Sequence, residues 1–197
     1  VGVGGREEDY RAVGVALDEK RLGRLEEQVG LMRRAWAGEQ VVEGALRPVE
    51  PNPVQPGGPE ILAGSLFPRS IRRAARWADG LCGFSFGPSA EEVGRQFELA
   101  RTAWKGEARS SPPRLVTGCW FALGSGGRAQ MDGYLQRYLN FMGPGVAQAL
   151  APTVTTISGP ALRDAARMIE DLGADELILA PTTSDPDEVH RVADLLG

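Results

Sequence analysis

Short apolar runs alternate with amphipathic segments of helical period along the chain, and this alternation limits the folds open to it. Five runs have the length and composition of buried strands, and each precedes a helix-like segment. The predicted strands are Val1–Gly5, Ile61–Ala63, Leu81–Phe86, Arg114–Leu123 and Glu176–Ala180. Strands that alternate with helices predict right-handed parallel units whose helices cover the sheet. An open doubly wound sheet and a closed β/α barrel both satisfy this order.

The predicted helices follow from apolar spacing and from capping signals. The expected N-caps are Asp18, Ser89, Ser158 and Asp185, and Pro68 is the expected first residue of a further helix. Gly80 is the expected C-cap of the second helix, and Val189, Val192 and Leu195 are the expected inward-facing residues of the last. A helical insertion is predicted over about 126–157. Residues 39–58 carry four prolines, which predicts an irregular surface segment.

The stretch Pro59–Asp79 has the pattern of a strand, a glycine turn and a helix. Gly64 and Ser65 end the apolar run, and Pro68 stands where a first helical turn needs no N–H donor. Free N–H groups of that first turn would face the space beyond the strand's carboxyl end, where a phosphate can bind. An ordinary β/α turn without a ligand explains the same residues, and this stretch alone does not separate the two readings.

Both candidate architectures bind ligands at the carboxyl ends of their strands. The sequence therefore directs attention to five loops. They are Gly4-Gly5-Arg6, Gly64-Ser65-Leu66, Ser85-Phe86-Gly87, Leu123-Gly124-Ser125 and Pro181-Thr182-Thr183. Gly2-Val3-Gly4-Gly5 does not match a dinucleotide fingerprint, because its third glycine is missing and a polar loop follows.

Composition narrows the function classes. The net charge is −4 and 42% of residues are hydrophobic, as in an ordinary globular chain with no preference for nucleic acid. No apolar run approaches the roughly 20 residues of a membrane span, so we expect a cytoplasmic protein without a membrane partner. Cys82 and Cys119 lack metal-ligand spacing and are expected to be reduced core residues, and His190 is expected to be a solvated helix residue.

Four segments together resemble the luciferase-like monooxygenase family, which includes bacterial luciferase and deazaflavin-dependent reductases and dehydrogenases. The segments are Gly2–Tyr10, Leu25–Trp36, Pro59–Ser65 and Ala74–Gly80. The resemblance extends over residues 1–197 in the same element order. It implies an eight-stranded β/α barrel of the TIM type with an insertion before the last strand.

The resemblance further implies that residues 1–197 form a single domain, the fourth to eighth units of that barrel. The first three strands, with the catalytic histidine that many relatives carry on the second, would lie outside these residues. This chain by itself is therefore expected to be inactive. Arg6 and Glu7 are the remaining catalytic candidates. The acidic run that contains Glu7 is better explained as an exposed charged loop.

The family binds FMN or a deazaflavin (coenzyme F-420) at the carboxyl-end face, with the phosphate near the glycine turn after the fifth strand. The implied cofactor-binding residues are Gly4, Gly5, Ala63, Gly64, Ser65 and Leu66. A phosphate-binding arginine of luciferase corresponds here to Val3, which leaves that contact without a counterpart.

The resemblance thus implies an oxidoreductase or monooxygenase that takes a flavin-type cofactor and a small-molecule substrate, with a homodimer as an open question. Only Lys20 and Lys105 are lysines among 22 basic residues, an arginine-rich composition that favours the deazaflavin slightly over FMN. Two alternatives stay open. One is a non-catalytic flavin-binding or structural relative. The other is an unrelated doubly wound nucleotide-binding domain, which a reversal of strand order would reveal.

Overall fold

A four-stranded, entirely parallel sheet organises the computed structural model, which describes residues 1–18, 20–143 and 145–197. The strands are β1 (Leu62–Gly64), β2 (Gly80–Cys82), β3 (Arg114–Phe121) and β4 (Glu176–Pro181). They pair in the order β1-β2-β3-β4, so each strand lies beside the next one in the chain. The prediction of an α/β fold with a parallel sheet is confirmed, and the described strands show no reversal of order.

The expected first strand, Val1–Gly5, is not a strand in the structure. Val1 nevertheless pairs with β1: its amino group donates to the Leu62 carbonyl over 2.7 Å, and the Gly64 N–H donates to the Val1 carbonyl over 2.6 Å. These two bonds have the pattern of a parallel ladder. A Cβ on Gly2 would lie 3.1 Å from the Gly64 carbonyl oxygen, so glycine permits this close approach.

Helices occupy most of the positions that periodicity predicts. They are α1 (Glu7–Ala12), α2 (Arg21–Trp36), α3 (Pro68–Ala74), α4 (Ala90–Gly106), α5 (Gly127–Tyr138), α6 (Val146–Leu150), α7 (Gly159–Asp171) and α8 (Asp187–Leu196). Two 3₁₀ turns, η1 (Asn140–Met142) and η2 (Ala151–Thr153), complete the insertion. The segment 39–58 has neither helix nor strand, as its prolines predict.

Two predictions about where helices begin are confirmed, together with their physical cause. Ser89 Oγ accepts the Glu92 N–H over 3.1 Å and caps α4, and Pro68 is the first residue of α3. Helix α2 begins at Arg21, later than expected, because the Asp18 carboxylate accepts the Lys20 N–H in a turn before the helix.

Three local expectations are wrong. Residues 7–12, expected to be a polar loop, form α1. Gly80 does not cap α3, which ends at Ala74; it opens β2, where a Cβ would lie 2.2 Å from the Arg114 carbonyl oxygen. Val189 is 55% exposed, whereas its neighbour Glu188 is fully buried.

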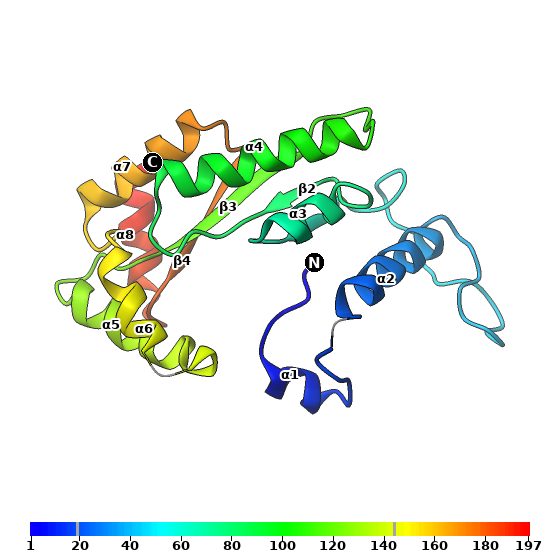
Figure 1. Ribbon diagram of the computed structural model, residues 1–197, viewed down its shortest axis with the longest axis horizontal. Coiled ribbons are helices and arrows are strands. Elements are labelled where there is room, and N and C mark those ends of the chain that lie inside the picture. Colours follow the sequence, from blue (N-terminus) through cyan, green and yellow to red (C-terminus); the bar gives the residue numbers. More distant parts are fainter. Residues whose placement is uncertain (19, 144) are drawn as a thin grey trace.

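The core divides into two clusters. The larger lies between the sheet and the helices α3 and α4, and includes Ile71, Leu81, Phe97 and Trp104. Figure 1 shows α4 lying along β3, and the α5–α6 insertion beyond the carboxyl end of that strand. The second cluster packs the insertion against Trp120 near the carboxyl end of β3. The insertion therefore covers the edge of the sheet where ligands are expected.

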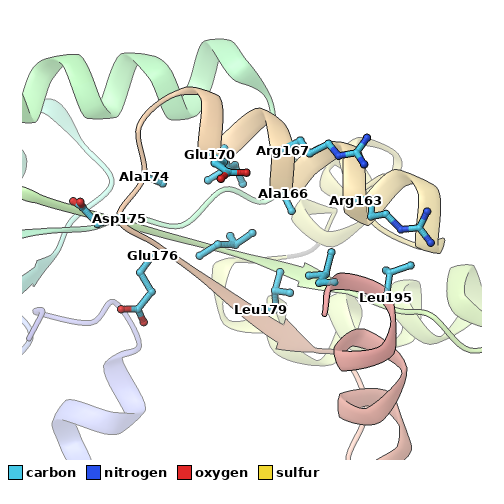
Figure 2. Close-up of a pocket in the computed structure, with 12 residues that line it drawn as sticks. Arg163, Ala166, Arg167, Glu170, Ala174, Asp175, Glu176, Leu179 and Leu195 are labelled. Carbon is cyan, nitrogen blue, oxygen red and sulfur yellow. The ribbon is translucent and has the colours of Figure 1, made fainter.

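The outer side of β4 forms a groove of about 490 Å³ with α7 and α8 (Figure 2). Leu179 and Leu195 contribute apolar surface to it, and Arg163, Arg167 and Glu170 from α7 line the same groove. Within the described residues β4 pairs on one side alone, with β3, and Ile178 in β4 is 43% exposed. The second edge of β4 is thus open to another strand.

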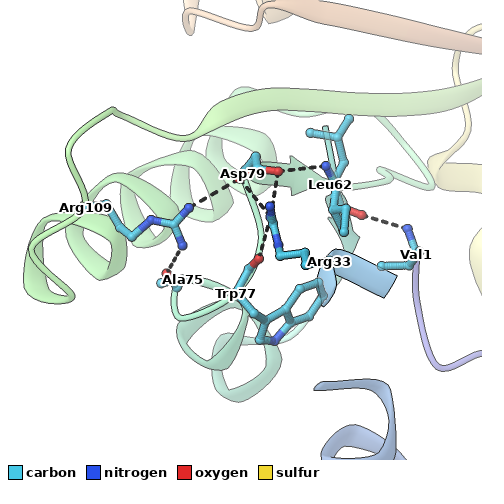
Figure 3. A network of polar contacts seen from close by, with 8 residues as sticks. Val1, Arg33, Leu62, Ala75, Trp77, Asp79 and Arg109 are labelled. Carbon is cyan, nitrogen blue, oxygen red and sulfur yellow. Dashed lines mark hydrogen bonds and ion pairs between the residues drawn. The ribbon is translucent and has the colours of Figure 1, made fainter. Parts of the chain in front are cut away.

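Asp79 joins three elements at the amino end of the sheet (Figure 3). Its carboxylate accepts the Ile61 N–H over 2.9 Å, Arg33 Nη2 over 2.9 Å and Arg109 Nη2 over 3.4 Å. The two arginines also donate to the carbonyls of Trp77 and Ala75. Because the carboxylate links α2, the start of β1 and the segment after α4, its charge stabilises their relative position.

We expect Asp79→Asn to lower the free energy of unfolding by about 2 kcal/mol, because hydrogen bonds to a charged partner weaken when the charge is removed. The measurement is urea unfolding followed by circular dichroism. Glu91→Gln is the matched control, since the Glu91–Arg95 pair is highly exposed and should contribute little. Equal effects of the two substitutions would contradict this role of Asp79.

Candidate functional site

A cavity of about 520 Å³ lies at the carboxyl ends of β1, β2 and β3. Three parts of the chain line it. The first is the N-terminal segment, and the second is the β1–α3 turn with nearby residues of α2 and α3. The third is a set of aromatic residues, of which some follow β2, one lies near the end of β3 and others come from the insertion. This volume and this mainly apolar lining are typical of a small-molecule site. The position agrees with the rule that ligands bind at the carboxyl edge of a parallel sheet.

Five of the six expected cofactor-binding residues meet at this cavity. They are Gly4, Gly5, Gly64, Ser65 and Leu66. The sixth, Ala63, is 1% exposed and packs in the larger core cluster instead. The alternation of side chains along a strand explains this, because Ala63 turns toward the helices. Whether the five residues bind a cofactor stays a prediction, but the structure places them on one surface.

The amides of the glycine turn are less free than the sequence suggests. The Gly64 N–H donates to Val1, and the Ser65 N–H donates to the Cys82 carbonyl over 3.3 Å. The N–H groups of Gly64 and Ser65 are therefore not available to an anion. Among the described residues, no backbone carbonyl accepts from the N–H groups of Leu66 and Phe67. The donors left at this turn are those two amides and the Ser65 hydroxyl.

A bidentate ion pair lies in the cavity wall. Arg73 on α3 donates through Nε to Glu26 Oε1 over 2.8 Å and through Nη2 to Oε2 over 2.6 Å. Both side chains are less than one third exposed, and both line the cavity. The hydrogen bonds from Arg73 hold the pKa of Glu26 below its usual range, against the opposing effect of burial. Glu26 is therefore a carboxylate at neutral pH and not a proton donor.

Five aromatic rings form one packed cluster at the other side of the cavity. Trp120 is at its centre, with ring centroids at 4.9 Å to Phe84, 5.3 Å to Phe86, 5.8 Å to Tyr134 and 5.7 Å to Tyr138. Tyr134 stacks on Tyr138 at 5.5 Å with the planes 10° apart. Four of the five rings line the cavity, Tyr134 being behind Tyr138. The sequence analysis did not predict this aromatic wall. The Ser85-Phe86-Gly87 loop, expected at the ligand-binding edge, was the one local indication of it.

The two catalytic candidates lie outside the cavity lining. Arg6 places its guanidinium over the ring of Phe141, 5.0 Å from the centroid, at the edge of the site. Glu7 is exposed and pairs with Arg11 one turn along α1, at 3.0 Å. His190 is exposed on α8. Glu7 thus has the environment of a solvated helix residue, whereas Arg6 lies beside a residue that lines the cavity.

The described residues offer no group of three or more histidine, cysteine or carboxylate side chains that could bind a metal ion. No described helix is both long and apolar enough to span a bilayer. Both cysteines are free thiols, in agreement with the sequence-based expectation. Cys119 is fully buried, and burial raises the pKa of its thiol to about 12. Cys82 is half-buried, and burial raises its thiol pKa as well.

We expect Cys119 to resist iodoacetamide in the folded protein at pH 8, because a thiol with a pKa near 12 is almost wholly protonated and its sulfur is shielded. Mass spectrometry of the alkylated peptides before and after addition of urea measures this. Cys82 provides the internal comparison and should react faster. Labelling of Cys119 in the folded protein at the rate of a free thiol would contradict its burial.

The fold and the cavity define an α/β protein of the parallel β/α type with a ligand site at the carboxyl edge of its sheet. The sequence model of the family described as luciferase-like monooxygenase matches residues 1–191, and this chain belongs to that family. No curated protein matches the chain in a sequence comparison.

Three solved structures illustrate the similarity of the fold. Monooxygenase RslO1 from Streptomyces bottropensis aligns with a TM-score of 0.69 and 21% identity, over 98% of this chain and 64% of its own. An F420-dependent secondary alcohol dehydrogenase in complex with an F420-acetone adduct aligns with a TM-score of 0.69 and 12% identity, over 100% and 68%. Riboflavin lyase (RcaE) with modified FMN aligns with a TM-score of 0.61 and 14% identity, over 97% and 60%. The chain thus spans less than two thirds of the length of RslO1.

Proposed function

We propose that this chain supplies the cofactor-binding part of a flavin- or deazaflavin-dependent oxidoreductase or monooxygenase that acts on a small molecule. The observation that carries the proposal is the convergence of Gly4, Gly5, Gly64, Ser65 and Leu66 on one cavity at the carboxyl edge of the sheet. Family membership supports it, as do similar folds in structures that hold an F420-acetone adduct and modified FMN.

The phosphate end of the cofactor would bind at the β1–α3 turn. The Ser65 hydroxyl and the N–H groups of Leu66 and Phe67 are the donors left there. Arg73 lies in the same wall, but its guanidinium is paired with Glu26. Hydrogen bonds from such groups to a charged phosphate are among the stronger ones in proteins. When bound, the cofactor supplies hydride transfer or oxygen activation, while the protein binds it, orients it and excludes water.

FMN and the deazaflavin coenzyme both suit this site, since each combines a flat ring system with a phosphate. The aromatic residues Phe84, Phe86 and Trp120 keep water from the deep part of the cavity, as redox chemistry on such a ring requires. No catalytic residue is assigned. Arg6 is the stronger of the two earlier candidates, because it lies over Phe141 at the edge of the cavity.

The proposed domain organisation is a partial barrel, with these 197 residues as its last five β/α units. The open edge of β4 and the groove beside it would take further strands and helices, and Val1 already continues the pairing beyond β1. The relative lengths of the aligned enzymes support this arrangement. An unmatched strand edge exposes backbone donors and acceptors, so residues 1–197 alone should bind cofactor weakly.

The test is titration of the full-length protein with FMN and with coenzyme F-420, followed by the fluorescence of each cofactor. Ser65→Ala should weaken binding of the preferred cofactor about tenfold, the loss expected for one hydrogen bond to a phosphate. Ser111→Ala is the matched control, because Ser111 is exposed in the loop before β3, at the opposite edge of the sheet.

Equal affinities of the two serine variants would contradict the proposed phosphate position. Failure of the unaltered protein to bind either cofactor would contradict the proposed function. Cofactor binding without turnover of any substrate would instead identify the non-catalytic alternative.

A further inference from the structure

We propose that the aromatic side of the cavity binds a neutral, planar aromatic substrate, so that the enzyme acts on a ring compound and not on a straight-chain or ionic one. This inference rests on the proposed function, because it assumes that the cofactor phosphate occupies the β1–α3 turn and leaves the aromatic side for the substrate. Ring geometry, exposure and charge each support it.

The ring geometry fixes a rigid wall. Trp120 is 3% exposed and contacts four other rings, three of them edge-on. Tyr134 covers one face of Tyr138, whereas 46% of Tyr138 stays exposed where it lines the cavity. Rings held by such contacts lose little conformational freedom when a ligand stacks on them, and edge-to-face or offset-stacked pairs are favourable.

Four large apolar side chains with high exposure line this cavity. Phe67, Tyr138, Phe141 and Met142 are each between 40% and 72% exposed, and all four line it. Phe67 comes from the β1–α3 turn, Tyr138 from the end of α5, and Phe141 and Met142 from η1. A contiguous apolar patch of this kind on a protein surface marks a binding site, because exposing it to water is unfavourable unless a ligand covers it.

The charged side chains of the cavity wall favour a neutral substrate. Glu26 and Arg73 carry the charged side chains among the residues that line it, and each neutralises the other in a bidentate pair. A substrate carboxylate or ammonium beside Trp120 would lose its hydration without gaining an ionic partner, because Arg6 lies over Phe141 at the edge of the cavity. The face of an aromatic ring offers what a flat, neutral substrate needs: apolar area and a defined stacking geometry.

The experiment compares two neutral probes of different shape, 2-naphthol and 1-decanol, by isothermal titration calorimetry at pH 7. The full-length protein is titrated with and without its preferred cofactor. We expect 2-naphthol to bind at least tenfold more tightly than 1-decanol. The double substitution Tyr138→Leu with Phe141→Leu should weaken 2-naphthol binding about tenfold, since it removes two ring contacts but keeps apolar side chains. It should change 1-decanol binding less than about twofold.

Tyr138→Phe is the matched control, because it keeps the ring and removes the hydroxyl alone; 2-naphthol should then bind within about twofold of the unaltered protein. Cofactor affinity is measured for each variant. It shows whether the variant is folded, and whether the cofactor ring itself contacts the aromatic residues. A cofactor affinity that falls tenfold in the double variant would overturn the inference, since the wall would then hold the cofactor ring. Equal or tighter binding of 1-decanol would also overturn it. Titration of the cofactor-free protein with 2-naphthol tests the aromatic side of the cavity by itself. Its result therefore stands even if the protein binds neither cofactor and the proposed function fails.

Discussion

Parallel backbone pairing in chain order is the constraint on which the rest of this structure depends. The hydrogen bonds that run from Val1 through β4 place the carboxyl end of every strand at the same edge of the sheet. At two points the pairing requires glycine, since a Cβ on Gly2 or Gly80 would press on a neighbouring carbonyl oxygen. Because each β/α unit returns the chain to the same edge, residues far apart in sequence converge there, and the cavity is a consequence of that pairing.

The architecture is readable from the sequence where the signal is local. Arg114–Leu123 and Glu176–Ala180 are apolar runs, and both become strands. Helices bury β3 along almost its whole length, whereas β4 is only partly buried. Ser89 and Ser158 cap their helices for the reason that the sequence provides, a hydroxyl placed to accept a free N–H. The β1–α3 turn reaches the cavity because it follows the carboxyl end of a strand, and that placement needs no tertiary information.

Features made by tertiary contact could not be read in this way. Glu26 and Arg73 are 47 residues apart, and nothing near either residue indicates the other. The apolar stripe of α5 does not reveal that its last ring, that of Tyr138, faces a cavity. Val189 was expected to be buried from helical spacing. Instead Glu188 is buried, because its carboxylate accepts the Leu123 N–H and Arg191 Nη1, which offsets the loss of its hydration.

The central claim is that the cavity at the carboxyl edge holds the phosphate of a flavin-type cofactor at the β1–α3 turn. A crystal structure of the full-length protein with its preferred cofactor tests this most directly. The account predicts phosphate oxygens about 3 Å from the Ser65 hydroxyl and the Leu66 N–H, with the ring system inside the cavity. A cofactor bound at the amino edge of the sheet, near Asp79 and Arg109, would contradict it.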